Sequence, residues 1–215
     1  MERAPCDRRN AQKKTPVAVE RDRPAVVEKR RHFALRQVLL KVARLVFVDE
    51  SGFRLGTPPR YGWSQRGVKS VGKHVCGRWE TITMLGAIAL DGFRGFMTIN
   101  AATSGDVFLA FVEQQLVPQL RRRDIVVMDN LAAHKRPEVL AAIRAAGAKV
   151  MFLPPYSPEF NPIERLWAKL KDFVRRCSTA NRDAFDAAVR DAMDAISTED
   201  IRAWTQFAGC DLTAS

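Results

Sequence analysis

The order of five short apolar runs constrains the fold of this chain more than any other feature. The runs cover residues 45–49, 81–90, 93–99, 125–129 and 149–153, and their length is typical of buried strands. Asp91-Gly92, between the second and third runs, predicts a tight antiparallel hairpin. Helical patterns over 104–120 and 137–146 separate the later runs. This order predicts an α/β fold, a mixed five-stranded sheet flanked by helices, with right-handed crossovers on one side.

The segments outside these runs predict an N-terminal extension and a helical end. Residues 1–23 mix charged residues and proline with few large apolar residues, which is typical of a flexible basic arm. Residues 24–44 predict an amphipathic basic helix that packs on the main domain. Its expected inward residues are Val26, Val27, Phe33, Leu35, Val38, Leu39 and Val42. Helices over 183–196 and 198–207 are expected to close the main domain, leaving 208–215 as a C-terminal tail.

Charge and composition narrow the class of protein. The chain has 35 Lys and Arg against 24 Asp and Glu, a net charge of +11. Residues 1–44 and 45–182 each carry a net charge of +8, so the excess of positive charge is not confined to one tail. A polyanionic partner fits this balance, although a solvated basic surface would give the same composition. Because the sequence has neither an 18-residue apolar window nor a signal peptide, we expect a cytoplasmic protein with no membrane partner.

Two acids follow buried apolar runs, and together they predict a metal site. Asp49 ends the run that begins at Leu45, and Asp129 ends the run that begins at Ile125. Strand ends of this kind meet at the crevice where α/β sheets bind ligands. Two carboxylates in one crevice repel each other unless a cation such as Mg²⁺ lies between them. Each acid alone is more typical of a strand-end Asp that binds nearby loop amides, and only the two together favour a metal site.

A third acid, Glu164, follows a stiff loop rich in proline. The segment Asn161-Pro162-Ile163-Glu164 also fits a helix cap in which the Glu side chain reaches back to the cap amide. The rigid loop over 153–160 favours a different role, because it would hold one carboxylate in a fixed place. Spacing alone favours the helix cap, and the stiff loop is what weakens that interpretation.

Three segments resemble the acidic motifs of DDE transposases, in particular the bacterial insertion-sequence relatives of the mariner group. They are VFVDESG over 46–52, VMDNLAAHK over 127–135 and LPPYSPEFNPIE over 153–164. The 34 residues between Asp129 and Glu164 match the spacing in that family. The resemblance implies a ribonuclease H-like fold, with residues 45–207 as the DDE catalytic domain. It also implies that Asp49, Asp129 and Glu164 are the catalytic triad and bind two Mg²⁺ ions, with Mn²⁺ as a substitute.

The same resemblance implies an activity and partners. The expected activity is metal-dependent DNA cleavage at the ends of a mobile element and strand transfer during transposition. The expected partners are double-stranded DNA at the element ends, target DNA at TA sites, and a second copy in a homodimer near the nucleoid. Further residues expected to contact DNA or orient loops are Asn130, His134, Lys135, Arg60, Lys73, Arg165 and Lys169. For His134, an ordinary surface histidine is an equal alternative.

Other interpretations remain open. The 44 residues before the first acidic strand are too few for a helix-turn-helix module. That module would then lie on a separately encoded N-terminal partner, or the chain would be a truncated copy or an excised domain. The alternatives to a transposase are another ribonuclease H-like nuclease and a catalytically silent DNA-binding partner or inhibitor of a full-length transposase.

Overall fold

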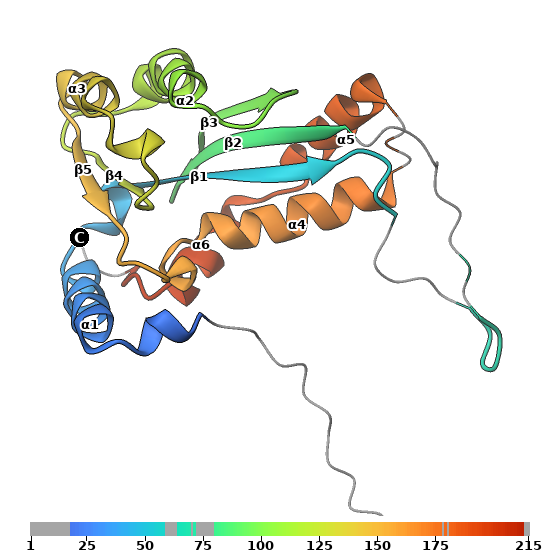
Figure 1. Cartoon of the computed structure of the whole chain (residues 1–215), viewed down its shortest axis with the longest axis horizontal. Coiled ribbons are helices and arrows are strands. Elements are labelled where there is room, and N and C mark those ends of the chain that lie inside the picture. Colours follow the sequence, from blue (N-terminus) through green and yellow to red (C-terminus); the bar gives the residue numbers. More distant parts are fainter. Residues whose placement is uncertain are drawn as a thin grey trace, which may run out of the picture.

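The computed structural model describes residues 18–58, 64–69, 71, 80–177, 179 and 181–212. A five-stranded sheet with the order β3-β2-β1-β4-β5 forms its centre (Figure 1). The strands are β1 (Leu45–Arg54), β2 (Thr81–Ala89), β3 (Gly92–Ile99), β4 (Ile125–Met128) and β5 (Lys149–Phe152). The first three pair antiparallel, whereas β4 and β5 run parallel to β1. The predicted mixed sheet and its hairpin are therefore confirmed.

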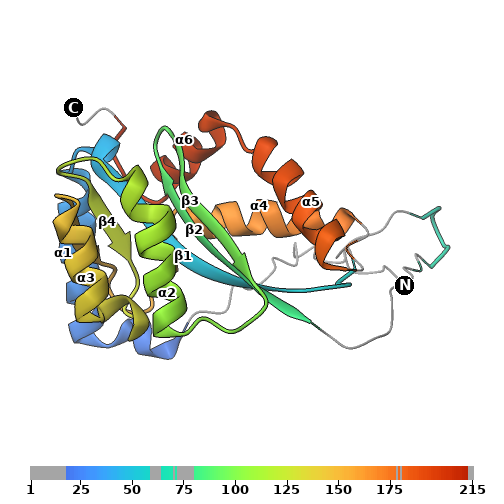
Figure 2. The same ribbon diagram turned by 90° about the horizontal axis from the view of Figure 1, so that it is seen from above.

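Helices cover both faces of the sheet (Figures 1 and 2). One face carries α2 (Gly105–Phe111), which continues as a π-helical turn, and α3 (Pro137–Ala145). The other carries α4 (Ile163–Arg176), α5 (Arg182–Asp194) and α6 (Thr198–Phe207). Each face has its own apolar core, because successive residues of β1 alternate between them. None of the helices in the described part of the chain is long and apolar enough to cross a membrane.

The long strand β1 brings two of the predicted acids to one place. The expectation that this strand ends at Asp49 is wrong, because β1 continues pairing with β2 as far as Arg54. Its parallel pairing with β4 is much shorter and ends with Phe47 opposite Val127. Asp49 and Asp129 each lie two residues beyond that pair, so the sheet register places both acids beside the end of β4.

The N-terminal helix α1 (Pro24–Val38) lies beside β5 (Figure 1). The expected amphipathic helix over 24–44 is wrong in two respects. The α-helix stops at Val38, and a separate 3₁₀ turn spans Val42–Arg44. Of its residues only Phe33 and Gln37 are buried. Most of the expected inward side chains are instead exposed, namely Val27, Leu35, Val38 and Leu39. The helix therefore docks along a narrow line rather than on a broad apolar face.

Both expected terminal segments are partly packed on the domain. Residues 1–17 of the predicted arm lie outside the described residues, but Val19–Asp22 forms a 3₁₀ turn. In the predicted tail, Ala208 and Cys210 are buried. The Nε2 of Gln37 donates a hydrogen bond to Cys210 Sγ at 3.0 Å, which joins α1 to the C-terminal segment.

Candidate active site

The three predicted acids line one pocket of about 390 Å³. Asp49 comes from β1, Asp129 follows β4, and Glu164 lies in the first turn of α4. The proline-rich loop between β5 and α4 forms the opposite wall. Within the described ranges, no three His, Cys, Asp or Glu side chains are grouped closely enough to hold a metal ion. The fold thus brings the acids to one pocket without closing them into a ligand shell.

Asp49 has the most perturbed carboxyl group of the pocket. Burial and the charge of Glu164, with a smaller contribution from Asp129, raise the pKa of Asp49 to about 7. Hydrogen bonds from the Glu50 backbone and the Trp167 side chain oppose this rise only in part. A carboxylate in this state gains most from a nearby positive charge.

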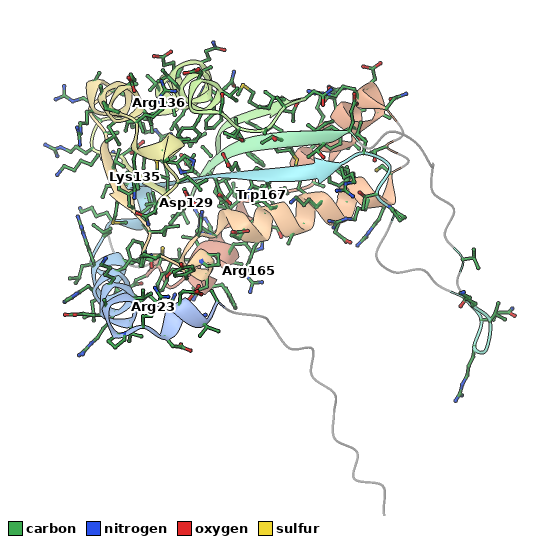
Figure 3. All side chains as sticks on the ribbon, viewed as in Figure 1. Arg23, Asp129, Lys135, Arg136, Arg165 and Trp167 are labelled. Atoms are coloured by element: carbon green, nitrogen blue, oxygen red, sulfur yellow. The ribbon has the colours of Figure 1, made fainter. Side chains whose placement is uncertain are left out.

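The indole of Trp167 on α4, labelled in Figure 3, supports Asp49. Its Nε1 donates a hydrogen bond of 3.0 Å to Asp49 Oδ2. Gly86 is the residue opposite Asp49 on β2, and a Cβ there would lie 2.7 Å from Trp167 Cη2. The helical spacing of Trp167 predicts only a core position and does not reveal this contact. The available signal was chemical, because a buried tryptophan N–H needs an acceptor.

Replacing Gly86 by Ala should displace the Trp167 ring and lower the free energy of unfolding by about 1–3 kcal/mol. The matched control is Gly52→Ala on β1, where the nearest atom to an added Cβ is Thr81 Cγ2 at 3.8 Å. Denaturant unfolding of both variants checks this prediction. Equal stabilities would show that the Gly86 position does not determine where the ring lies.

Asp129 is held by the loop that follows it. Its Oδ1 accepts a hydrogen bond from the Leu131 amide at 3.0 Å and lies 2.7 Å from His134 Nδ1. Burial raises the pKa of Asp129, but hydrogen bonding to His134 and the Leu131 amide and the charges of His134 and Lys135 lower it by more. The net pKa of Asp129 is therefore below its ordinary value. His134 itself is fully buried, with its ring 4.1 Å from that of Phe108. The surface-histidine alternative is therefore wrong.

Glu164 does not cap its own helix. The N-terminal residue before α4 is Pro162, and no side chain makes a cap hydrogen bond there. The expected Asn161 cap is therefore wrong. Asn161 instead lines the pocket, and its buried Oδ1 has no hydrogen-bond partner among the described residues. Partial burial, with a contribution from the charge of Asp129, raises the pKa of Glu164 against the opposing effect of Lys171.

The loop before Glu164 is fastened to α1 by Arg30. This side chain donates hydrogen bonds to Tyr156 O at 3.1 Å and Ser157 Oγ at 2.6 Å, and it pairs with Glu159. Arg21 also pairs with Glu159, at 2.9 Å. Aromatic contact between α1 and the loop adds to these bonds, so the helix holds the pocket wall in place.

Arg30→Ala should lower the free energy of unfolding by about 1–2 kcal/mol, because the variant leaves several polar groups of the loop without a donor. Arg31→Ala is the matched control, since Arg31 is the exposed neighbour on the same helix. We expect its effect to stay within about 0.5 kcal/mol. Thermal and denaturant unfolding check both variants, and similar losses would contradict the docking role of Arg30.

The other predicted residues have separate locations. Asn130 Nδ2 donates to Leu153 O and lines the pocket. Lys135 is exposed, with Nζ 5.6 Å from the Phe152 ring. Arg165 lies over the Phe207 ring at 3.5 Å, and Lys169 pairs with Asp200 at 2.5 Å. Both of these contacts are to α6, and neither residue lines the pocket. Arg60 and Lys73 lie outside the described residues.

Comparison with known families identifies the class of protein. Residues 44–186 match the family model described as DDE superfamily endonuclease, so the chain belongs to this family. The match includes all three acids of the pocket. No curated protein sequence matches the chain significantly.

Solved structures of Mos1 transposase share the fold. The Mos1 paired-end complex with the left transposon end superposes with a TM-score of 0.76 at 14% identity, covering 92% of this chain and 63% of that chain. The isolated catalytic domain of Mos1 mariner transposase superposes with a TM-score of 0.65 at 12% identity, covering 89% of this chain and 90% of that domain. The ribonuclease H-like fold is therefore confirmed. The chain spans about 63% of the length of the Mos1 chain in the paired-end complex.

Proposed function

We propose that this chain is the catalytic domain of a transposase, which cleaves DNA at element ends and transfers the strands to a target. The observation that carries this proposal is one pocket lined by Asp49, Asp129 and Glu164 from three separate segments. Carboxylates collected in this way repel one another, and burial together with this repulsion raises the pKa of Asp49. Divalent cations relieve it.

The pocket chemistry fits Mg²⁺, with Mn²⁺ as a substitute. Its donors are oxygen atoms of Asp49, Asp129 and Glu164, and Asn161 adds a buried Oδ1 that has no partner among the described residues. Hard divalent cations prefer such oxygen ligands. Structures of the Mos1 catalytic domain with Mn and with Mg support the same assignment. Two bound ions would activate a water or a DNA 3′-hydroxyl and stabilise the leaving oxygen.

Residues around the acids have positioning roles in this proposal. Trp167 fixes one oxygen of Asp49, and His134 holds Asp129 from a buried position. Arg30 binds the loop that precedes Glu164. Such support keeps metal-binding side chains near one productive geometry.

The proposed partner is double-stranded DNA, as element ends and as target at TA sites. The net charge of +11 suits a polyanion, and Mos1 structures are complexes with a transposon end and in a strand-transfer state. A homodimer near the nucleoid completes the proposal.

Incubation of the chain with end-labelled duplex DNA tests this function. Strand cleavage should occur with Mg²⁺ or Mn²⁺ and stop when EDTA is added. Binding without cleavage, both alone and with an N-terminal partner, would favour the catalytically silent partner. Preferential cleavage of RNA–DNA hybrids would favour another ribonuclease H-like nuclease.

A further inference from the structure

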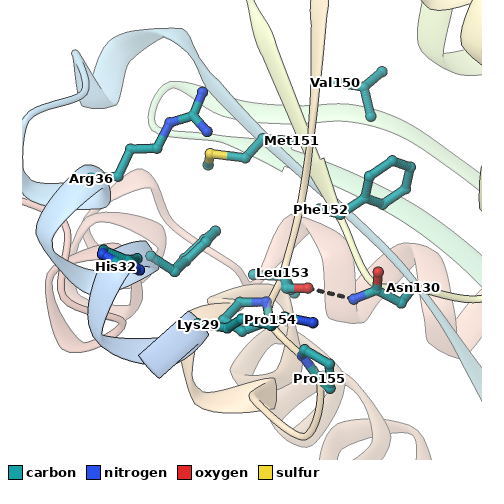
Figure 4. Close-up of a pocket in the computed structure, with 11 residues that line it drawn as sticks. Lys29, His32, Arg36, Asn130, Val150, Met151, Phe152, Leu153, Pro154 and Pro155 are labelled. Carbon is teal, nitrogen blue, oxygen red and sulfur yellow. Dashed lines mark hydrogen bonds between the residues drawn. The ribbon is translucent and has the colours of Figure 1, made fainter. Parts of the chain in front are cut away.

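A second pocket, of about 440 Å³, adjoins the acidic pocket (Figure 4). One wall is α1, which contributes Lys29, His32 and Arg36. The other wall is β5, which is the edge strand of the sheet, and the start of the proline-rich loop. We call this pocket the basic groove. Among the described residues that line it there is no carboxylate.

The three basic residues occupy one face of α1. Their positions, 29, 32 and 36, follow the helical spacing that places side chains in a row. All three are exposed, and within the described part of the chain neither Lys29 nor Arg36 forms an ion pair. The neighbouring Arg30 differs from them, because its guanidinium forms an ion pair with Glu159. The groove therefore carries positive charge that no described side chain neutralises.

The basic groove leads into the acidic pocket. Asn130, Leu153, Pro154 and Pro155 line both of them, and Asn130 and Leu153 are joined by a hydrogen bond at this boundary (Figure 4). Among the described residues, the lining of the acidic pocket includes three carboxylates and neither Lys nor Arg. A ligand lying across both would present anionic groups to the groove and a metal-bound group to the acids.

We propose that the basic groove binds the phosphate backbone of the DNA strand whose scissile phosphate enters the acidic pocket. This inference rests on the proposed function and adds the path of the strand. From Lys29 to Arg36 the helix rises about 10 Å, at 1.5 Å per residue. At 3.4 Å per nucleotide, that length corresponds to about three nucleotides next to the reacting one.

An added peptide strand is the competing occupant, because β5 has an open edge. The chain's own N-terminal segment does not suit the groove, since residues 1–17 carry five basic and two acidic side chains. Positive charge in the groove would repel that segment. A nucleic acid strand matches both the charge of the groove and its continuity with the three acids.

The test compares two double variants of the same net charge. Lys29→Gln with Arg36→Gln removes two charges from the groove, and Arg144→Gln with Arg190→Gln removes two exposed charges from α3 and α5. Fluorescence anisotropy in EDTA gives the affinity for labelled duplex DNA over a series of salt concentrations. The groove variant should lower the slope of log K against log salt by about 2, since each lost phosphate contact removes about 0.9. Its affinity should fall about tenfold or more at moderate salt, whereas the control should change less than about twofold.

The outcomes separate the groove from the proposed function. Equal slopes for the two double variants would overturn the groove proposal, and so would an acidic peptide that binds wild type but not the groove variant while DNA binding is unchanged. Lysine acetylation gives an independent readout, because bound DNA should protect Lys29 but not the exposed Lys41. If wild type binds DNA through the groove but never cleaves it, the groove keeps its role in binding a DNA backbone, whereas the transposase proposal and the path to a scissile phosphate fail.

Discussion

Asp49→Asn, Asp129→Asn and Glu164→Gln should each slow metal-dependent DNA cleavage by on the order of a thousandfold or more. Each amide keeps the shape of the side chain and removes the charge that binds a cation. Catalytic groups that act as a unit fail together, so combining the three substitutions should cost little more than one alone. Single-turnover cleavage of labelled duplex DNA, at saturating protein, measures the loss.

The control for these variants is Asp172→Asn, an acid on the same helix as Glu164 that does not line the pocket and whose described partner is Arg176. Cleavage by this variant should stay near wild type. Glu164→Gln is the most informative of the three variants. Glu164 makes no helix cap in the structure, so the Gln variant should fold normally. Full cleavage by Glu164→Gln would remove that residue from the catalytic unit.

Without metal, Asp49→Asn should stabilise the protein at pH 8. The folded-state pKa of Asp49, about 7, lies above its ordinary value of 3.8, so folded protein binds more protons than unfolded chain between those pH values. Stability of wild type therefore falls as pH rises through this window, and Asn removes the loss. A pKa difference of this size limits the stabilisation by Asp49→Asn to about 4 kcal/mol. Because Asp49 is only half-buried, solvent screening makes the effect smaller than this limit. We therefore expect Asp49→Asn to raise the free energy of unfolding by about 1–2 kcal/mol.

Asp129→Asn is the control of opposite sign. The pKa of Asp129 is lowered in the folded state, so its ionised form stabilises the protein above the ordinary pKa, and this stabilisation is lost as pH falls. Asp129→Asn should therefore lower the melting temperature at pH 8, where Asp49→Asn raises it. Thermal unfolding in EDTA from pH 4 to pH 8 measures both. Changes of the same sign in the two variants would contradict the electrostatic account of the pocket.

Local patterns were sufficient to predict the sheet and the three acids. Asp49 and Asp129 each end a short apolar run of the sequence, and Glu164 follows a proline-rich loop, so each signal lies within a few neighbouring residues. Thr198–Phe207 illustrates the same point, because the helix has the predicted bounds and begins at a capping box formed by Ser197 and Asp200. Such features need no information about distant parts of the chain.

Features that depend on tertiary contacts could not be predicted in this way. The apolar residues of α1 suggested a broad buried face, but the helix meets the domain through Arg30, Phe33 and Gln37. The burial of His134 against Asp129 requires α2 to lie above that loop, where Phe108 meets the ring. Likewise, Trp167 reaches Asp49 only because Gly86 leaves space beside it. In each case the decisive partner lies far away in the sequence.

Anomalous diffraction from crystals soaked in Mn²⁺ tests the central claim most directly, because it locates the metal without relying on activity. The account predicts an anomalous peak in the acidic pocket within about 2.2 Å of carboxylate oxygens of Asp49 and Asp129, with Glu164 turned towards it. The peak should be absent from crystals of the variant that combines Asp49→Asn and Asp129→Asn. An empty wild-type pocket at saturating Mn²⁺, or a peak bound only by residues elsewhere, would contradict the claim.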